Sequence, residues 1–339
     1  MRKDTVFYKK AVIMGLLSVY MLCGCSGEKE PESERYQSEK SVYDVQQQEP
    51  EKAPAANAET KEPEKVPTAN AETEEPKEDT LEAVITEVNW ESYFDGMNGA
   101  AVIYDPSENS YQIYHQDMAL SRRSPCSTFK IISSLIALEN KVLIPEDSTR
   151  TWSGEIFWNE NWNRDISFED AFRTSCVWYY RELIDEIGKD VMQEELNKLH
   201  YGNCDISDWE GYLNTNNNNR ALTGFWIESS LKISPKEQVE VLERIFREDS
   251  VYSQETQDKL KQVMLISEWE NKDMLIYGKT GLGKAHGVVV DAWFTGFADT
   301  ADGRKYFCVY LGETDGKDVS STKAKEIAVK IVSDLERAG

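Results

Sequence analysis

Strand-forming segments lie at both ends of the folded part of this chain, and helix-forming sequence fills the stretch between them. Runs of alternating apolar residues bounded by turn residues predict five strands. The predicted strands are residues 98–105, 110–115, 273–280, 287–297 and 305–311. Because both groups of strands have apolar faces to bury, we expect them to pair in one antiparallel sheet flanked by helices. This is an α/β (α+β) fold that carries an inserted all-helical subdomain at about 145–266.

Several helices are expected from apolar residues at helical spacing. They cover 168–172 running into 177–180, then 191–199, 235–246 and, at the end of the chain, 321–338. The helix at 235–246 has the clearest start, because Ser234 is a good N-cap residue and Pro235 suits the first helical position.

The first 24 residues are predicted to be a lipoprotein signal peptide. A basic start precedes an apolar run at 11–22 that is short for a membrane span. The run ends in Leu22-Cys23-Gly24-Cys25, which resembles the lipobox of bacterial lipoproteins. Cys25 would then carry the lipid, and several acyl chains give stable anchoring. The alternative is an ordinary secretory signal with an incidental cysteine. We expect an exported protein that is lipid-anchored to the bacterial membrane on its extracytoplasmic side.

Residues 25–85 are predicted to be an acidic, disordered tether. Glu, Lys, Pro, Ala, Asn and Thr dominate this stretch, and apolar side chains are too sparse to offset the entropy lost on folding. The segment 56–63 is nearly repeated at 69–76, but two copies without an apolar face do not make a repeat fold. The formal net charge of −23 and the lack of a basic stripe argue against nucleic acid as a partner.

The cysteines and histidines give no sign of a metal site. Six cysteines are present, and Cys23 and Cys25 belong to the signal and anchor. The other four are Cys126, Cys176, Cys204 and Cys308. Two disulfides and buried free thiols are both compatible with their wide spacing. The three histidines are scattered, and no CxxC or HExxH motif occurs.

A serine and a lysine stand at the start of a predicted helix, within Pro125-Cys126-Ser127-Thr128-Phe129-Lys130. The apolar run 131–138 follows, and the helix is expected to end near Asn140. Ser127 would lie beside the unpaired N–H groups of the first turn, with Lys130 one turn later on the same face. If burial lowers the pKa of Lys130, its amine can accept the Ser127 proton. Taken alone, such a pair is often an ordinary feature of a helix surface.

Four later features favour the catalytic interpretation. They are Ser175 in Ser175-Cys176-Val177, the loop Tyr201-Gly202-Asn203, Trp226, and Lys279-Thr280-Gly281 at the end of a strand. Each has a structural explanation of its own: a surface serine, a turn, a core tryptophan or an edge-strand charge. Their joint order and spacing favour one functional set.

This set resembles the class D β-lactamases, the oxacillinase family of the penicillin-recognising serine enzymes. The resemblance runs from about Asn89 to the C-terminus, and 162–165, 231–235 and 237–239 also look like that family. Class A relatives and penicillin-binding proteins carry S-D-N as the second motif and K-T-G as the third. Here Val177 stands in place of that asparagine, which points to class D. The resemblance implies a catalytic domain at 86–339.

The resemblance implies acyl transfer through a serine ester. Ser127 would attack the lactam carbonyl, and Ser175 would pass a proton to the departing nitrogen. The segment Lys279-Thr280-Gly281-Leu282 would bind substrate, with Lys279 and Thr280 at its carboxylate. The backbone N–H groups of Ser127 and Leu282 would form the oxyanion hole.

Lys130 has the most informative expected role. Phe129, Val177 and the apolar helix should desolvate its amine, which favours the neutral form. The family's lysine adds carbon dioxide, so the resemblance implies an N-carboxylated Lys130 as general base, without any other cofactor. The Trp226 indole would donate a hydrogen bond to it. Tyr201 and Asn203 are expected to support the site.

One departure concerns the substrate carboxylate. The family usually places an arginine near the start of the last helix, whereas this chain has Ser320-Ser321-Thr322-Lys323-Ala324-Lys325. Lys323 or Lys325 would be the substitute, as a point charge instead of a bidentate fork.

The sequence therefore predicts a membrane-anchored serine β-lactamase acting on small-molecule β-lactams. The first alternative is the related β-lactam sensor domain, which is acylated but does not turn over. Against it, no transmembrane helices or protease domain are recognised in this sequence, and Val177 keeps the lysine pocket apolar. The second alternative is a degenerate wall-binding or peptidoglycan-processing lipoprotein, which the complete set of catalytic groups disfavours.

Overall fold

The structure, a computed structural model, describes residues 82–267 and 274–338. The predicted signal peptide, the lipid site at Cys25 and residues 25–81 of the predicted tether lie outside the described residues. None of the helices in the described part of the chain is both long and apolar enough to cross a membrane.

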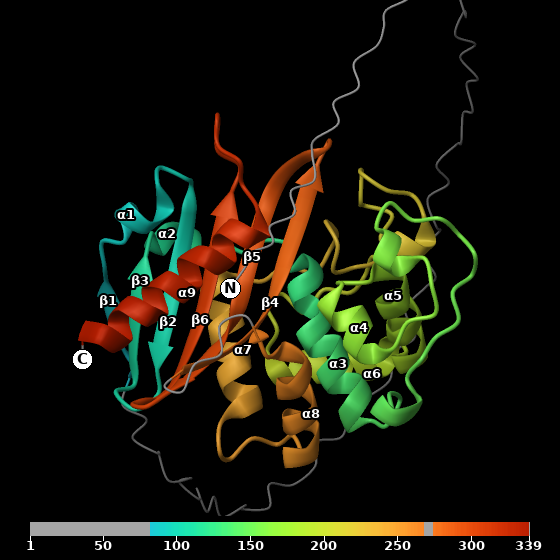
Figure 1. The fold of residues 1–339 in the computed structure, drawn as a ribbon, viewed down its shortest axis with the longest axis horizontal. Helices are drawn as coiled ribbons and strands as arrows, with labels where there is room; N and C mark the ends of the chain where they lie inside the picture. The colour runs from blue at the N-terminus through green and yellow to red at the C-terminus, as the bar shows by residue number, and fades with distance from the viewer. Residues whose placement is uncertain (1–81, 268–273, 339) are drawn as a thin grey trace, which may run out of the picture. The chain divides into compact units, whose positions relative to one another are not determined.

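The described part contains a six-stranded sheet in the order β1-β3-β2-β6-β5-β4 (Figure 1). The strands are β1 (Val84–Glu87), β2 (Gly99–Asp105), β3 (Ser110–Tyr114), β4 (Met274–Ala285), β5 (Val288–Thr300) and β6 (Gly303–Gly312). Only β1 and β3 run parallel; the other neighbours are antiparallel. Strand β2 pairs with β6, so the two ends of the folded part meet in one sheet, as predicted.

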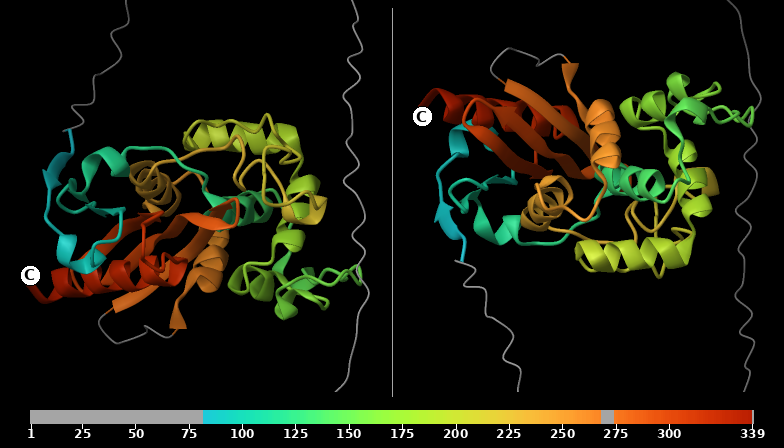
Figure 2. Two further views of the ribbon diagram at one scale, coloured as in Figure 1. Left: turned by 90° about the horizontal axis from the view of Figure 1, so that it is seen from above. Right: turned by 90° about the horizontal axis from the view of Figure 1, so that it is seen from below.

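Both faces of the sheet are buried, each in its own core. Successive strand residues point to opposite sides, so neighbouring residues of one strand belong to different cores. Phe294 faces α9 (Ser321–Ala338), which packs Ala324, Ala328 and Ile331 against the sheet. The neighbouring Trp293 faces the larger core on the other side. Figure 2 shows α9 on one face of the sheet and α7 (Pro235–Phe246) on the other.

The remaining helices lie mostly between β3 and β4 in the chain. They are α1 (Glu91–Phe94), α2 (Gln116–Ala119), α3 (Lys130–Glu139), α4 (Phe168–Arg173), α5 (Val177–Ile187), α6 (Lys189–Leu199) and α8 (Gln254–Met264). The predicted cap of α7 is confirmed: the Ser234 hydroxyl accepts from the Glu237 N–H, and the Glu237 carboxylate accepts from the Ser234 N–H.

The helical run expected across 168–180 is interrupted. Helix α4 ends at Arg173 and α5 begins at Val177. Between them Ser175 has a φ of 58°, a left-handed conformation that a continuous helix excludes. The four cysteines of the described part, Cys126, Cys176, Cys204 and Cys308, are free thiols.

Candidate active site

Ser127 lies in a 3₁₀ turn, Cys126–Phe129, that leads into α3. Hydrogen bonds fix the backbone just before it: the Cys126 N–H donates to the Trp226 carbonyl at 2.9 Å, and the Trp293 indole donates to the Ser124 carbonyl at 3.0 Å. Cys126 itself has a φ of 50°, an uncommon conformation for a residue with a side chain. Such backbone strain persists only where the surroundings over-determine it, and it is frequent at active sites.

Lys130 faces Ser127 from the first turn of α3. Its Nζ atom lies 3.1 Å from Ser127 Oγ and 5.1 Å from the centroid of the Tyr180 ring. The lysine is 1% exposed, and burial lowers the pKa of its amine to about 8. A neutral amine at this distance can accept the hydroxyl proton of Ser127. The predicted pair is therefore brought together.

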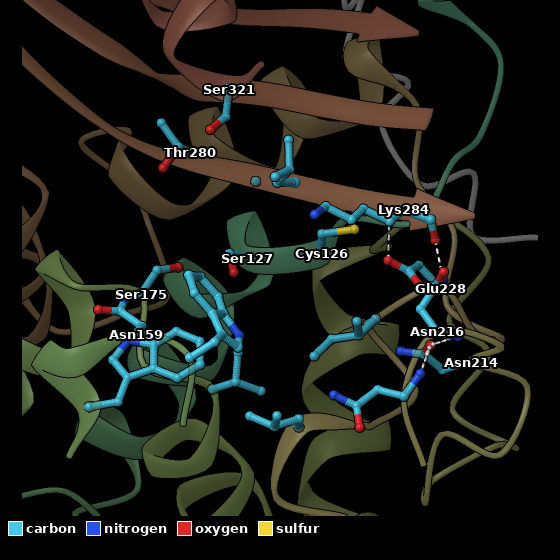
Figure 3. A pocket seen from close by; sticks show the side chains of 18 of the residues that line it. Cys126, Ser127, Asn159, Ser175, Asn214, Asn216, Glu228, Thr280, Lys284 and Ser321 are labelled. Atoms are coloured by element: carbon cyan, nitrogen blue, oxygen red, sulfur yellow. Dashed lines mark hydrogen bonds between the residues drawn. The ribbon is translucent and has the colours of Figure 1, made fainter. Parts of the chain in front are cut away.

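A cavity of about 390 Å³ opens in front of Ser127. Ser175, Val177, Thr280, Gly281 and Leu282 line it. Figure 3 shows the Ser175 hydroxyl directed toward Ser127 across the cavity floor. The left-handed turn at Ser175 between α4 and α5 gives the side chain this position. The two predicted hydroxyls thus share one cavity.

Strand β4 approaches the turn around Ser127 so closely that a side chain at Gly281 would disturb it. A Cβ atom there would lie 3.0 Å from the Pro125 carbonyl oxygen and 3.0 Å from Cγ2 of Thr128. Both distances are tighter than ordinary contact. Glycine therefore allows Thr280 and Leu282 to flank Ser127 along this strand.

Lys279 lies behind this wall and is not among the residues that line the main cavity. It is 5% exposed, its Nζ donates to the Thr280 carbonyl at 3.1 Å, and it lies 5.8 Å from the Phe172 ring centroid. Burial, and then the nearby Lys130, hold the pKa of Lys279 well below its usual range. In this position Lys279 supports the backbone of Thr280, whose own side chain lines the cavity.

The predicted substitutes for the family arginine lie elsewhere. Lys323 pairs with Glu326 at 3.0 Å, and Lys325 lines a separate cavity of about 280 Å³ together with Lys279. The residue of the last helix that lines the main cavity is Ser321, which lies near Thr280 in Figure 3. Two hydroxyls therefore stand where a carboxylate-binding group is expected.

Trp226 is fully buried beside the turn that carries Ser127. Its ring stacks on Phe129 at a centroid distance of 6.2 Å, and a Cβ atom at Gly224 would collide with it. Within the described part, Trp226 Nε1 has no hydrogen-bond partner. Leaving a buried N–H unpaired costs about 1–3 kcal/mol, so the position is suited to an acceptor.

Tyr201 and Asn203 hold neighbouring segments and do not line the cavity. The Tyr201 ring packs edge-on against Phe129 at 5.5 Å. The Asn203 amide donates to the Ser230 carbonyl and accepts from the Lys232 N–H, both at 2.9 Å. Their positions are consistent with the expected supporting function.

The far wall of the cavity consists of residues that the sequence analysis did not assign to a site. They include Asn214, Asn216, Glu228 and Lys284 (Figure 3), and Asn217 also lines the cavity. The Asn216 amide donates to the Glu228 carboxylate and to the Lys284 carbonyl. The composition of a polar stretch such as Asn214–Asn219 does not reveal which surface the loop faces.

Known proteins resemble this chain over the described domain. Residues 98–333 match the family described as "Penicillin binding protein transpeptidase domain". Probable beta-lactamase YbxI of Bacillus subtilis is 32% identical over 248 residues, which cover 73% of this chain and 85% of that protein. Regulatory protein BlaR1 of Bacillus licheniformis is 31% identical over 253 residues, 73% of this chain, but the chain spans only 39% of that longer protein.

Solved structures give the same two kinds of neighbour. The C-terminal domain of the Bacillus licheniformis BlaR penicillin-receptor has a TM-score of 0.65 and 29% identity, and the match covers 75% of this chain and 97% of that one. A class D beta-lactamase from Bacillus subtilis has a TM-score of 0.62 and 31% identity, and the match covers 73% of this chain and 95% of that one. These matches confirm the predicted fold class.

Proposed function

The chain belongs to the penicillin-binding protein transpeptidase family, and on that premise we propose that it hydrolyses β-lactam antibiotics as a class D serine β-lactamase. One observation carries the proposal. Lys130 Nζ lies 3.1 Å from Ser127 Oγ, and burial brings the pKa of its amine to about 8. A buried amine that can be neutral gives the serine a proton acceptor and makes it a nucleophile.

In the acylation step, Ser127 Oγ forms a bond to the lactam carbonyl carbon while its proton passes to the base at Lys130. The N–H groups of Ser127 and Leu282 would bind the oxyanion that develops; one such donor is worth about 3–4 kcal/mol in other enzymes. As the carbon–nitrogen bond breaks, the Ser175 hydroxyl donates a proton to the leaving nitrogen. Water then hydrolyses the serine ester.

The residues around Lys130 fit its expected N-carboxylation. Its amine can be neutral, Val177 contributes an apolar wall, and Trp226 offers a buried N–H without a partner in the described residues. A carboxylate on Lys130 Nζ, when present, supplies the general base for acylation and for ester hydrolysis. Trp226 would hold that carboxylate by donating its N–H. Val177 would exclude the water that stabilises the protonated, charged amine of Lys130.

A β-lactam sensor is the second candidate. The similarity to BlaR1 and to the receptor domain of BlaR supports it directly. A sensor and a hydrolase share the acylation step, and they differ in the lifetime of the serine ester. The decision therefore depends on deacylation.

Intact-protein mass spectrometry after addition of benzylpenicillin tests the proposal. A hydrolase should carry the acyl adduct transiently and return to its original mass when the antibiotic is exhausted. An adduct that persists for hours after removal of free antibiotic would favour the sensor. Heat-unfolded protein is the control for non-specific acylation.

We further propose that residues 1–24 direct export, that Cys25 carries a lipid, and that the segment from Cys25 to the start of β1 at Val84 tethers the catalytic domain. The support comes from the sequence alone. Cys25→Ser should move the protein from the membrane fraction to the soluble fraction without altering its specific activity. A variant that stays wholly membrane-bound would contradict this anchor.

A further inference from the structure

A buried arginine lies against the ring of Trp226. Arg181 belongs to α5, one turn after Val177, and its guanidinium carbon lies 5.1 Å from the Trp226 ring centroid. The same carbon lies 5.2 Å from the ring centroid of Trp209. Arg181 is 2% exposed and Trp226 is fully buried. A guanidinium at this distance from an indole face makes a favourable cation–π contact.

Burial of this charge is costly unless it is paired. Asp185, four residues along α5, accepts from the Arg181 guanidinium, and Arg181 Nη1 donates to the Trp209 carbonyl at 2.9 Å. Arg220 also pairs with Asp185. The pairing therefore keeps a cation against the indole, although burial lowers the pKa of Arg181.

The other neighbours of Trp226 fix where its ring lies. Phe129 stacks on it, Phe225 meets it edge-on at 5.2 Å, and Gly224 leaves room for it. These contacts are apolar or steric, and none polarises the ring. A cation over the ring face draws electron density toward it, which makes the Nε1–H a better donor.

We propose that Arg181 is a positioning residue for Trp226: it holds the indole in place and strengthens its Nε1–H as a donor toward a carboxylate on Lys130. This inference rests on the proposed carboxylation of Lys130. Arg181 does not touch substrate, and it does not line the main cavity. Its loss should therefore weaken carboxylation and leave the binding of the antibiotic unchanged.

Titration of the purified full-length chain with ¹³C-bicarbonate, followed by ¹³C NMR of the carbamate signal, measures carboxylation without reference to activity. Arg181→Met should raise the bicarbonate concentration needed for half-maximal labelling by about five- to tenfold, within the range expected for a desolvated cation–π contact. Arg181→Gln should behave similarly, and it provides a neutral variant if the methionine variant does not fold. Arg181→Lys, which keeps the charge, should need less bicarbonate for half-maximal labelling than Arg181→Met.

Arg220→Met is the matched control. Arg220 pairs with the same Asp185 at 2.9 Å, yet among the described residues the cation over the Trp226 ring is Arg181. Labelling of Arg220→Met should stay close to wild type. If Arg220→Met weakened labelling as much as Arg181→Met does, the inference would be overturned. The weaker labelling would then result from disrupting the ion pairs of Asp185 and not from removing the cation over the Trp226 ring.

Wild-type labelling in folded Arg181→Met or Arg181→Gln would overturn the inference alone and leave the proposed function standing. Absence of labelling in the wild-type chain would instead overturn the carboxylated base, and the inference with it. Melting curves of each variant establish that it is folded at the temperature of the titration.

Discussion

The Lys130 Nζ and Ser127 Oγ atoms lie 3.1 Å apart, and the lysine is buried at 1% exposure. Lys279, the second lysine of the predicted set, is buried nearby, and Lys130 contributes to its lowered pKa. The pKa of Lys130 itself is lowered by burial, which disfavours the charged amine. The site is therefore suited to holding Lys130 neutral beside its serine.

Removal of the nucleophile gives the first prediction. Ser127→Ala should abolish covalent labelling by penicillin, because no second hydroxyl of the predicted set is bonded to Lys130. Its stability should change by less than about 1.5 kcal/mol, since one hydrogen bond is lost. Intact-protein mass spectrometry measures the labelling, and Ser121→Ala is the control on an unrelated side chain. An acyl adduct on Ser127→Ala would contradict the assignment.

The pH dependence follows from the direction of the Lys130 shift. Burial lowers its pKa from 10.5 to about 8, so the neutral amine becomes more abundant as pH rises through that value. The acylation rate constant should increase about tenfold per pH unit well below this pKa and level off above it. Stopped-flow acylation at constant bicarbonate measures it. A flat profile across this range would contradict the role of Lys130.

The same shift affects stability. The folded pKa lies below the unfolded one, so between about 8 and 10.5 the unfolded chain binds more protons than the folded chain. This group's contribution to the free energy of unfolding should therefore increase with pH across that window. Below it, the penalty for burying Lys130 is present in full. The pKa of Lys279 is also lowered by burial, so its contribution to the free energy of unfolding should increase with pH as well.

Val177 is predicted to keep the lysine environment apolar. Cys176, the residue before it, is close enough to influence the pKa of Lys130, and Val177 lines the cavity with Ser127. Val177→Asn should favour the charged amine and lengthen the life of the acyl-enzyme about tenfold or more, the equivalent of one pKa unit. The apolar control Val177→Ile should have a smaller effect. The lifetime of the acyl-enzyme in each variant is measured by following the decay of the adduct by mass spectrometry. An unchanged lifetime in Val177→Asn would refute the role of Val177 in keeping the lysine environment apolar.

Local sequence signals predicted much of the fold. The cap at Ser234 and the extent of α9 depend on neighbouring residues, and both are confirmed. Strand β1 was missed because all four of its residues are exposed, which leaves no alternation to detect. The break at Ser175 was missed because a positive φ at a serine has no sequence signature.

The site was predictable where its residues are one turn apart, as Ser127 and Lys130 are. Other features arise from tertiary packing between distant segments. The position of Lys279 behind Thr280 depends on how closely β4 approaches the turn at Pro125. The contact between Arg181 and Trp226 joins α5 to a loop far along the chain, and no local pattern indicates it.

Steady-state hydrolysis of a chromogenic cephalosporin, with and without added bicarbonate, distinguishes a hydrolase with a carboxylated lysine from a sensor. We expect a burst followed by sustained turnover, which falls in degassed buffer and returns when bicarbonate is added. Lys130→Ala should lose turnover, and any ester it forms should persist. A single stoichiometric burst without turnover at saturating bicarbonate would contradict the hydrolase and leave the sensor as the function.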